Sequence, residues 1–307
     1  MSEALIFVLA GAFATATPLL LAALGELISE KSGVLNLSVE GMMAVGAATG
    51  FILVVSTGSH SFAMLGGAVA GMLLSCLFAL LVLRLLANQI ATGLAIGLLG
   101  LGVSALLGQY NEGATTSTIA KLDIPILSKI PLLGPILFHQ DIVVYLTFGF
   151  AAVVSWFMYR TKAGLMLRVV GENPQAAHSL GLHPTAIRFA AILFGGAMAG
   201  LAGAYASTVL TPLWSQGMIA GRGWIAIALV VFGSWRPARV TAGAYFFGAV
   251  QLLDLAVQSV GITIPSQVMT CVPYVSTIVI LAIVSRDTIR IRLNAPMSLG
   301  ETYQPAT

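Results

Sequence analysis

Charged side chains are scarce in this sequence. Asp, Glu, Lys and Arg together make up 8% of the 307 residues, whereas a soluble domain carries about 25%. Hydrophobic residues make up 58%, and the mean hydropathy is +0.97. This composition excludes a soluble domain and indicates an integral membrane protein. The hydrophobic runs continue over roughly 20 residues, whereas barrel strands alternate over about ten. We therefore expect an all-α polytopic membrane protein with about 8–10 transmembrane helices.

Cysteines and catalytic motifs are scarce as well. Two cysteines, Cys76 and Cys271, both lie in hydrophobic segments, so neither a disulfide framework nor a metal-ligand spacing is visible. The sequence holds no P-loop, no HExxH and no GxSxG motif. We expect no catalytic residue, no metal and no cofactor, and the chain is not predicted to be an enzyme. We also expect no cleavable signal, since Met1-Ser2-Glu3 is acidic where a signal peptide is basic.

Hydrophobic segments divide the chain. Each is close to the length that crosses about 30 Å of hydrocarbon, and they lie at 4–24, 34–55, 61–83, 90–108, 142–159, 189–210, 219–234, 240–258 and 268–285. The 219–234 segment is short and includes Gly221-Arg222-Gly223, so we expect a broken or re-entrant helix there. We expect one transmembrane domain over 1–285 and a cytoplasmic tail over 286–307.

Basic residues predict how the chain is oriented. The polar run 160–188 separates two long hydrophobic segments, and such a basic loop lies in the cytoplasm. If every segment crosses, eleven basic residues fall inside and three outside, with the N-terminus outside and the C-terminus in the cytoplasm. The inside residues are Lys31, Arg84, Arg160, Lys162, Arg168, Arg188, Arg236, Arg239, Arg286, Arg290 and Arg292, and the outside residues are Lys121, Lys129 and Arg222.

A short helix is predicted inside this basic loop. Asn173 is a good N-cap, Pro174 suits the first helical position, and Gly181 suits the position just past the C-cap. A capped helix of about two turns in a cytoplasmic loop indicates a surface that docks a partner.

Polar residues within the hydrophobic segments are candidates for a solute pathway. Asn36 and Glu40 are four residues apart, as Gln251 and Asp254 are three apart, so each pair is expected on one helix face. Polar groups in a membrane usually face a bundle interior or an aqueous cavity. Glu40 has an alternative role as a structural partner for a neighbouring helix. Asn88 is also a candidate, although capping of the next helix explains it without a ligand.

Glycines and tryptophans carry structural signals. Pairs spaced four apart, such as Gly196 and Gly200, allow transmembrane helices to pack closely. Trp214, Trp224 and Trp235 lie near proposed segment boundaries and are interpreted as anchors in the membrane interface.

Five segments in order resemble one family. They are SEKSGVLNLSVEGMMAVGAATGF, ANQIATGLAIGLLGLG, GLMLRVVGENPQAAHSLGL, FGGAMAGLAGAYAS and GRGWIAIALVVFGSW. Together they resemble the ABC-importer permeases of the branched-chain amino acid, simple sugar and nucleoside group. The likeness is strongest to the shorter permease subunit of nucleoside-type importers served by a basic-membrane lipoprotein, and it covers roughly residues 25–285.

The resemblance implies a transport machine with several partners. These are a second permease subunit that is often non-identical, an ABC ATPase, an extracytoplasmic binding protein or lipoprotein, and a small polar solute, all at a bacterial inner membrane; no nucleic acid is expected. It implies that the loop helix is the ATPase coupling helix, formed by Gly171, Glu172, Asn173, Pro174, Ala176, Ala177 and Gly181. Simple sugars or branched-chain amino acids are alternative cargoes, and an ion-coupled secondary transporter is the alternative class.

Overall fold

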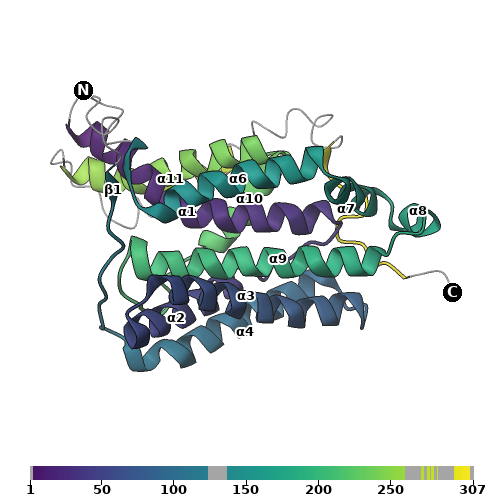
Figure 1. Cartoon of the computed structure of the whole chain (residues 1–307), viewed down its shortest axis with the longest axis horizontal. Helices are drawn as coiled ribbons and strands as arrows, with labels where there is room; N and C mark the ends of the chain where they lie inside the picture. Colours follow the sequence, from purple (N-terminus) through teal and green to yellow (C-terminus); the bar gives the residue numbers. More distant parts are fainter. Residues whose placement is uncertain are drawn as a thin grey trace.

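The computed structural model describes residues 3–123, 137–259 and 294–304, together with positions 271–272, 275–276, 278–279 and 282. The described chain is almost entirely helical (Figure 1). The helices are α1 (Glu3–Lys31), α2 (Val39–Thr57), α3 (His60–Leu83), α4 (Gln89–Gly108), α6 (Ile142–Arg160), α7 (Lys162–Glu172), α8 (Pro174–Ser179), α9 (Pro184–Tyr205), α10 (Arg222–Phe232) and α11 (Pro237–Ser259). Shorter elements are the 3-10 turn η1 (Gln109–Asn111), the π-helical turn η3 (Ala206–Leu210), and strands β1 (Leu122–Asp123) and β2 (His139–Gln140).

Six helices among the described residues are long and apolar enough to cross a membrane, namely α1, α2, α3, α4, α6 and α9 with its π-helical extension. The expected all-α polytopic fold is confirmed. Helix α11 adds 23 residues, which span about 34 Å at about 1.5 Å per residue. The segment predicted at 268–285 lies outside the described residues, apart from the isolated positions named above.

Helix α9 lies inside the bundle and packs against α1, α2 and α3 (Figure 1). Glycines make these contacts close. A Cβ on Gly71 of α3 would overlap the carbonyl oxygen of Gly196, and a Cβ on Gly203 would overlap the carbonyl oxygen of Met43. Only glycine allows the backbones to approach in this way, so the predicted close packing at Gly196 is confirmed.

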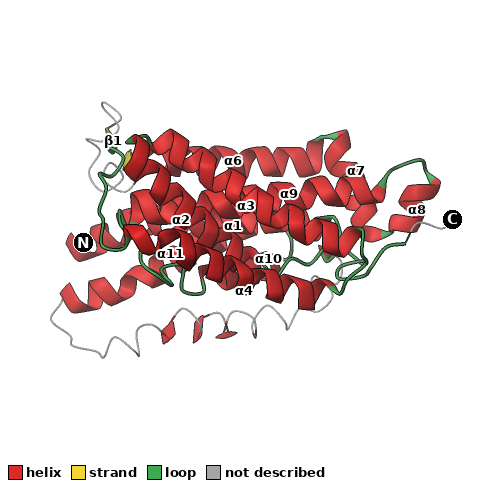
Figure 2. Cartoon of the chain, turned by 90° about the horizontal axis from the view of Figure 1, so that it is seen from below, coloured by secondary structure: helices red, strands yellow, loops and turns green. Residues whose placement is uncertain are grey.

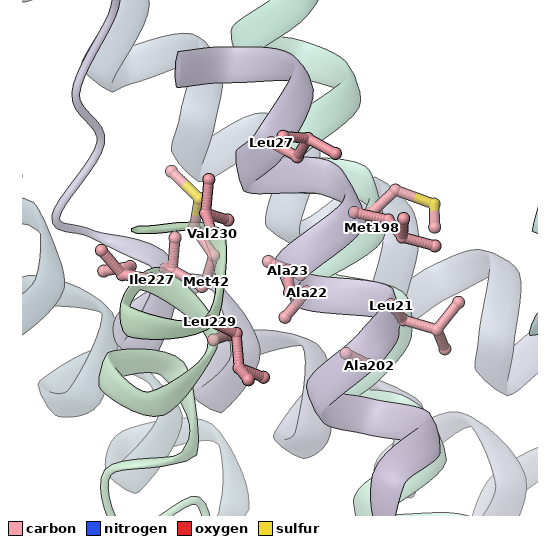
Figure 3. Packing of buried hydrophobic residues seen from close by; sticks show 14 of the residues in the cluster. Leu21, Ala22, Ala23, Leu27, Met42, Met198, Ala202, Ile227, Leu229 and Val230 are labelled. Atoms are coloured by element: carbon pink, nitrogen blue, oxygen red, sulfur yellow. The ribbon is translucent and has the colours of Figure 1, made fainter. Parts of the chain in front are cut away.

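The largest hydrophobic core lies where α1, α2, α9 and α10 meet (Figure 3). Leu27 of α1, Met42 of α2, Met198 of α9 and Val230 of α10 are each at most 4% exposed. In a membrane such a core gains little from leaving water, and its stability comes mainly from close packing. The core therefore fixes α10 against three helices that cross the bilayer.

The bundle has two unlike ends. At one end, which we call the strand end, β1 and β2 pair antiparallel with Leu122 opposite Gln140. There Asp141 caps α6 and also accepts a hydrogen bond from the Tyr205 hydroxyl at 2.7 Å, which ties α6 to the end of α9. At the other, the basic end, α1 finishes at Lys31 beside α7 and the tail 294–304 (Figure 1).

Between α9 and α11 the chain passes from the strand end to the basic end in two unlike parts (Figure 2). Residues 211–221 are irregular and begin at the strand end, where Leu213 bridges to Thr115. Helix α10 then continues towards Trp235, whose indole N–H donates to Glu30. Its 11 residues span about 16 Å, roughly half of the hydrocarbon thickness. The predicted broken helix at 219–234 is confirmed, and its helical part is α10.

The start of the second segment differs from expectation. Helix α2 begins at Val39, so Asn36 precedes the helix and does not share a helix face with Glu40. The physical cause is local, because the Asn36 side chain accepts a hydrogen bond from the Ser38 backbone N–H at 3.0 Å. Such a turn competes with helix formation. Helix α1, in contrast, continues to Lys31, seven residues past its predicted end at 24.

Two of the three tryptophans that were expected to be interface anchors, Trp214 and Trp235, are not. Trp214 is 2% exposed and Trp235 is 5% exposed, so both are buried within the protein. Trp214 fits because Gly108 has no side chain, and a Cβ there would overlap the indole ring. Trp235 can be buried because its indole N–H donates a hydrogen bond to the buried carboxylate of Glu30. Trp224, on α10, is 42% exposed.

Candidate functional site at the basic end and the broken crossing

The predicted docking helix forms as α8. The Asn173 side chain accepts a hydrogen bond from the Ala176 N–H at 2.9 Å, and Pro174 takes the first helical position. Gly181 follows the C-cap Leu180 and has a φ of +83°. All three sequence signals for the helix are confirmed. Figure 1 shows α8 projecting beyond the ends of the other helices, so a partner can reach it.

The two faces of this loop have different surroundings. Of the residues expected to couple to an ATPase, the buried ones are Gly171, Pro174 and Ala177, and the exposed ones are Glu172, Asn173, Ala176 and Gly181. The buried residues pack within the chain itself and cannot be first contacts for a partner. Leu180, which the sequence reasoning did not single out, is 75% exposed. The sequence did offer a signal for it: Leu180 is an apolar residue in a polar loop, next to the glycine that ends α8, and exposed apolar residues often mark a docking surface.

The tail 294–304 lies across the basic end and is held there by Arg188. This arginine is 1% exposed. It donates to the Ser32 carbonyl at 3.0 Å, to the Ser298 hydroxyl at 2.8 Å and to the Glu301 carbonyl at 3.3 Å. Ser298 in turn donates to the carbonyl of Gly171 at 2.7 Å. The tail therefore joins the ends of α1 and α7 to the start of α9.

Glu40 binds the N-terminus of α10. Its Oε1 accepts the N–H of Gly221 and its Oε2 accepts the N–H of Gly223, each at 2.7 Å. A Cβ on Gly223 would lie 2.5 Å from the Glu40 Cα, so glycine is needed for this approach. The carboxylate satisfies backbone donors that a helix start leaves unpaired, at the positive end of the helix dipole. Glu40 thus joins the start of α2 to the start of the half-helix.

Glu26 and Glu30 were not identified as buried acids from the sequence, because the first hydrophobic segment was expected to end at residue 24. Glu26 accepts the backbone N–H of Asn36 at 3.1 Å, and Glu30 accepts the indole N–H of Trp235. Both carboxyl groups are almost fully buried. Their four-residue spacing just before Lys31 was a usable signal, since it puts both on one helix face. They hold the loop after α1 and the turn after α10.

The remaining pathway candidates have different positions. Asn88 caps α4 by accepting the Ala91 N–H at 3.0 Å, which confirms the capping interpretation. Gln251 is half-buried on α11. Asp254 also lies on α11, but its side chain is outside what the structure describes. Asn36 and Glu40 lie on either side of the start of α2 and have different hydrogen-bond partners, and a pathway role for all these residues stays a prediction.

Comparison with known proteins agrees with this architecture. The family model for the permease component of branched-chain amino acid transport systems matches residues 8–284. A Haloferax volcanii protein, provisionally named a glucose ABC transporter permease, is 38% identical over 310 residues and covers 94% of each chain. A nucleoside ABC transporter permease of Lactococcus lactis is 35% identical over 280 residues, covering 87% of this chain and 88% of its own.

A guanosine ABC transporter permease of Bacillus subtilis is 35% identical over 284 residues, with the same coverage of 87% and 88%. No solved structure matches the chain significantly. The family match and the relatives both cover nearly the whole chain. The chain therefore belongs to the branched-chain amino acid transport system permease family and is a multi-pass permease subunit of an ABC importer.

Proposed function

We propose that this permease carries nucleosides or a related small, neutral, polar solute into the cell. It works with a second, non-identical permease subunit, an ABC ATPase that docks on α8, and an extracytoplasmic binding protein that delivers the solute. The N-terminus lies outside and the basic end faces the cytoplasm, since the described basic residues predicted inside lie at or beside that end.

The observation that carries the cargo proposal is the occupied N-terminus of α10. In transporters with broken helices, the N-terminus of a half-helix is where an anionic group of the solute is bound. Here Glu40 already takes the N–H groups of Gly221 and Gly223. A solute carboxylate would find these two N–H groups already taken, and the charge of the nearby Arg222 guanidinium is already balanced by Glu40. This arrangement favours a neutral solute over an amino acid.

The names of the relatives give two neutral candidates. The Lactococcus lactis and Bacillus subtilis relatives are named for nucleoside and guanosine transport. The Haloferax volcanii relative is named for glucose, which makes a simple sugar the second candidate. Both solutes satisfy the charge argument, whereas a branched-chain amino acid does not.

Uptake into proteoliposomes tests the cargo. The permease is reconstituted with its partner permease, ATPase and binding protein, and ATP-dependent uptake of radiolabelled guanosine, glucose and leucine is compared. Guanosine is expected to be taken up best, and leucine not above an ATP-free control. Uptake of leucine in preference to both neutral solutes would contradict the proposal.

The docking surface has a separate test. Leu180→Asp places a charge on the exposed tip of the α8 loop without disturbing the buried Ala177. We expect recovery of the ATPase with the purified permease to fall by about tenfold, a loss of about 1.4 kcal/mol. Tyr110→Asp is the control, since Tyr110 is 88% exposed and follows α4 towards the strand end. Equal ATPase recovery in both variants would show that α8 is not the docking element.

A further inference from the structure

A cavity of about 300 Å³ lies between α2, α4 and the irregular segment 214–219. Ala44 and Ala47 form the α2 wall, and Gly102 and Ser104 belong to the α4 wall. The third wall includes Trp214 and the residues that follow it. Small side chains on two helices leave this space open. Its size falls at the lower end of known ligand pockets, about 300–1,000 Å³.

The chemistry of the walls is neutral. The twelve described residues that line the cavity include no charged side chain. Their polar groups are the Ser104 and Ser215 hydroxyls and the Gln216 amide, and the Trp214 indole supplies an aromatic surface. The Ser104 hydroxyl donates to the Ala44 carbonyl at 2.8 Å, which keeps its oxygen able to accept a hydrogen bond. Such a site can bind a hydroxyl-bearing solute with an apolar or planar face.

The backbone of the third wall also indicates contact with water. Residues 216, 217 and 220 are exposed within the irregular segment that leads from the strand end to α10. Within a bilayer, non-helical backbone occurs only where it is buried in protein or lines a water-filled cavity. Where this segment lies within the bilayer, its exposed part therefore faces water or another protein subunit rather than lipid. Tight turns then return the chain to the start of α10. They lie at Gly217 and Gly221, whose φ angles are +77° and +84°.

We propose that this cavity is a solute-binding subsite of the permease, holding one neutral, hydroxyl-bearing molecule of nucleoside or monosaccharide size. The inference rests on the proposed function and extends it, because it places the solute on α4 and segment 214–219 rather than at Asn36 or Glu40. Glu40 then acts as a positioning residue, since it holds the start of α10 directly after the third wall.

Filling the cavity is the first test. A Cβ on Gly102 has no atom within 4 Å, so Gly102→Leu fits the fold and occupies space that the solute needs. Gly149→Leu is the matched control, because Gly149 is also an exposed helical glycine with no atom within 4 Å of its Cβ position. Gly102→Leu should lower guanosine or glucose uptake by about tenfold or more, whereas Gly149→Leu should match the wild type. Equal uptake in the two variants would overturn the subsite.

Protection of a cysteine is the second test and needs no transport. Gln216→Cys is made in a background with Cys76→Ser and Cys271→Ser, and its rate of maleimide labelling is measured in nanodiscs. Saturating guanosine or glucose should slow labelling by about tenfold, whereas labelling of Ser117→Cys in the same background should not change.

The two measurements separate the subsite from the cargo. Lack of protection by both solutes overturns the subsite, whatever the complete importer transports. Protection without uptake by the complete importer would support the subsite and count against the proposed cargo.

Discussion

Replacing Glu40 by alanine is the sharpest test of how the broken crossing is held. The two carboxylate oxygens accept the N–H groups of Gly221 and Gly223 at 2.7 Å each. Glu40 itself is 6% exposed. Water therefore cannot readily reach the Gly223 N–H, which is buried and would remain unpaired, whereas the Gly221 N–H is partly buried.

The magnitude follows from these contacts. A hydrogen bond to a charged group contributes about 1.5–3 kcal/mol, so losing two costs about 3–6 kcal/mol. Glu40→Gln keeps one acceptor and turns an N–H₂ group towards the second donor, so we expect about half of that loss. Glu112→Ala is the control, because Glu112 is exposed in the loop after α4.

Unfolding in mixed detergent micelles measures the loss, and hydrogen exchange localises it. The peptide that covers 218–226 should exchange faster in Glu40→Ala than in the wild type, while peptides of α6 should not change. A Glu40→Ala protein with wild-type stability and wild-type exchange at 218–226 would refute the reasoning. It would show that the carboxylate does not hold α10.

Three further predictions concern packing, the tail and sidedness. Gly203→Leu should prevent stable folding, at a cost of about 3 kcal/mol or more, because even a Cβ overlaps the α2 backbone; monodisperse elution on size exclusion would contradict it. Arg188→Met should release the tail, seen as faster digestion by carboxypeptidase, since its two hydrogen bonds to Ser298 and Glu301 are lost; unchanged digestion would mean that other contacts suffice. In a background without native cysteines, Lys162→Cys and Ser117→Cys should label from opposite sides of the membrane, since they lie at the basic end and in the strand-end loop; labelling from one side would overturn the orientation.

The sequence alone determined what local chemistry controls. Low charge and long hydrophobic runs specify a helical membrane protein, because lipid offers no partner for backbone polar groups. The caps of α8 were readable at Asn173 and Gly181, since capping depends on residues next to each other in the chain. The break before α10 was readable as well, because the segment is too short to cross and includes two glycines beside Arg222.

The tertiary structure decided what depends on distant residues. Nothing local shows that Glu40 meets Gly221 and Gly223, which lie 181 and 183 residues away in the chain. Periodicity could not show that Ala177 is buried while Leu180 is exposed, because the answer depends on what packs behind α8. The cavity beside Gly102 likewise exists only because α2, α4 and segment 214–219 meet. Sequence fixes which groups must be satisfied, and long-range packing decides which partner satisfies each one.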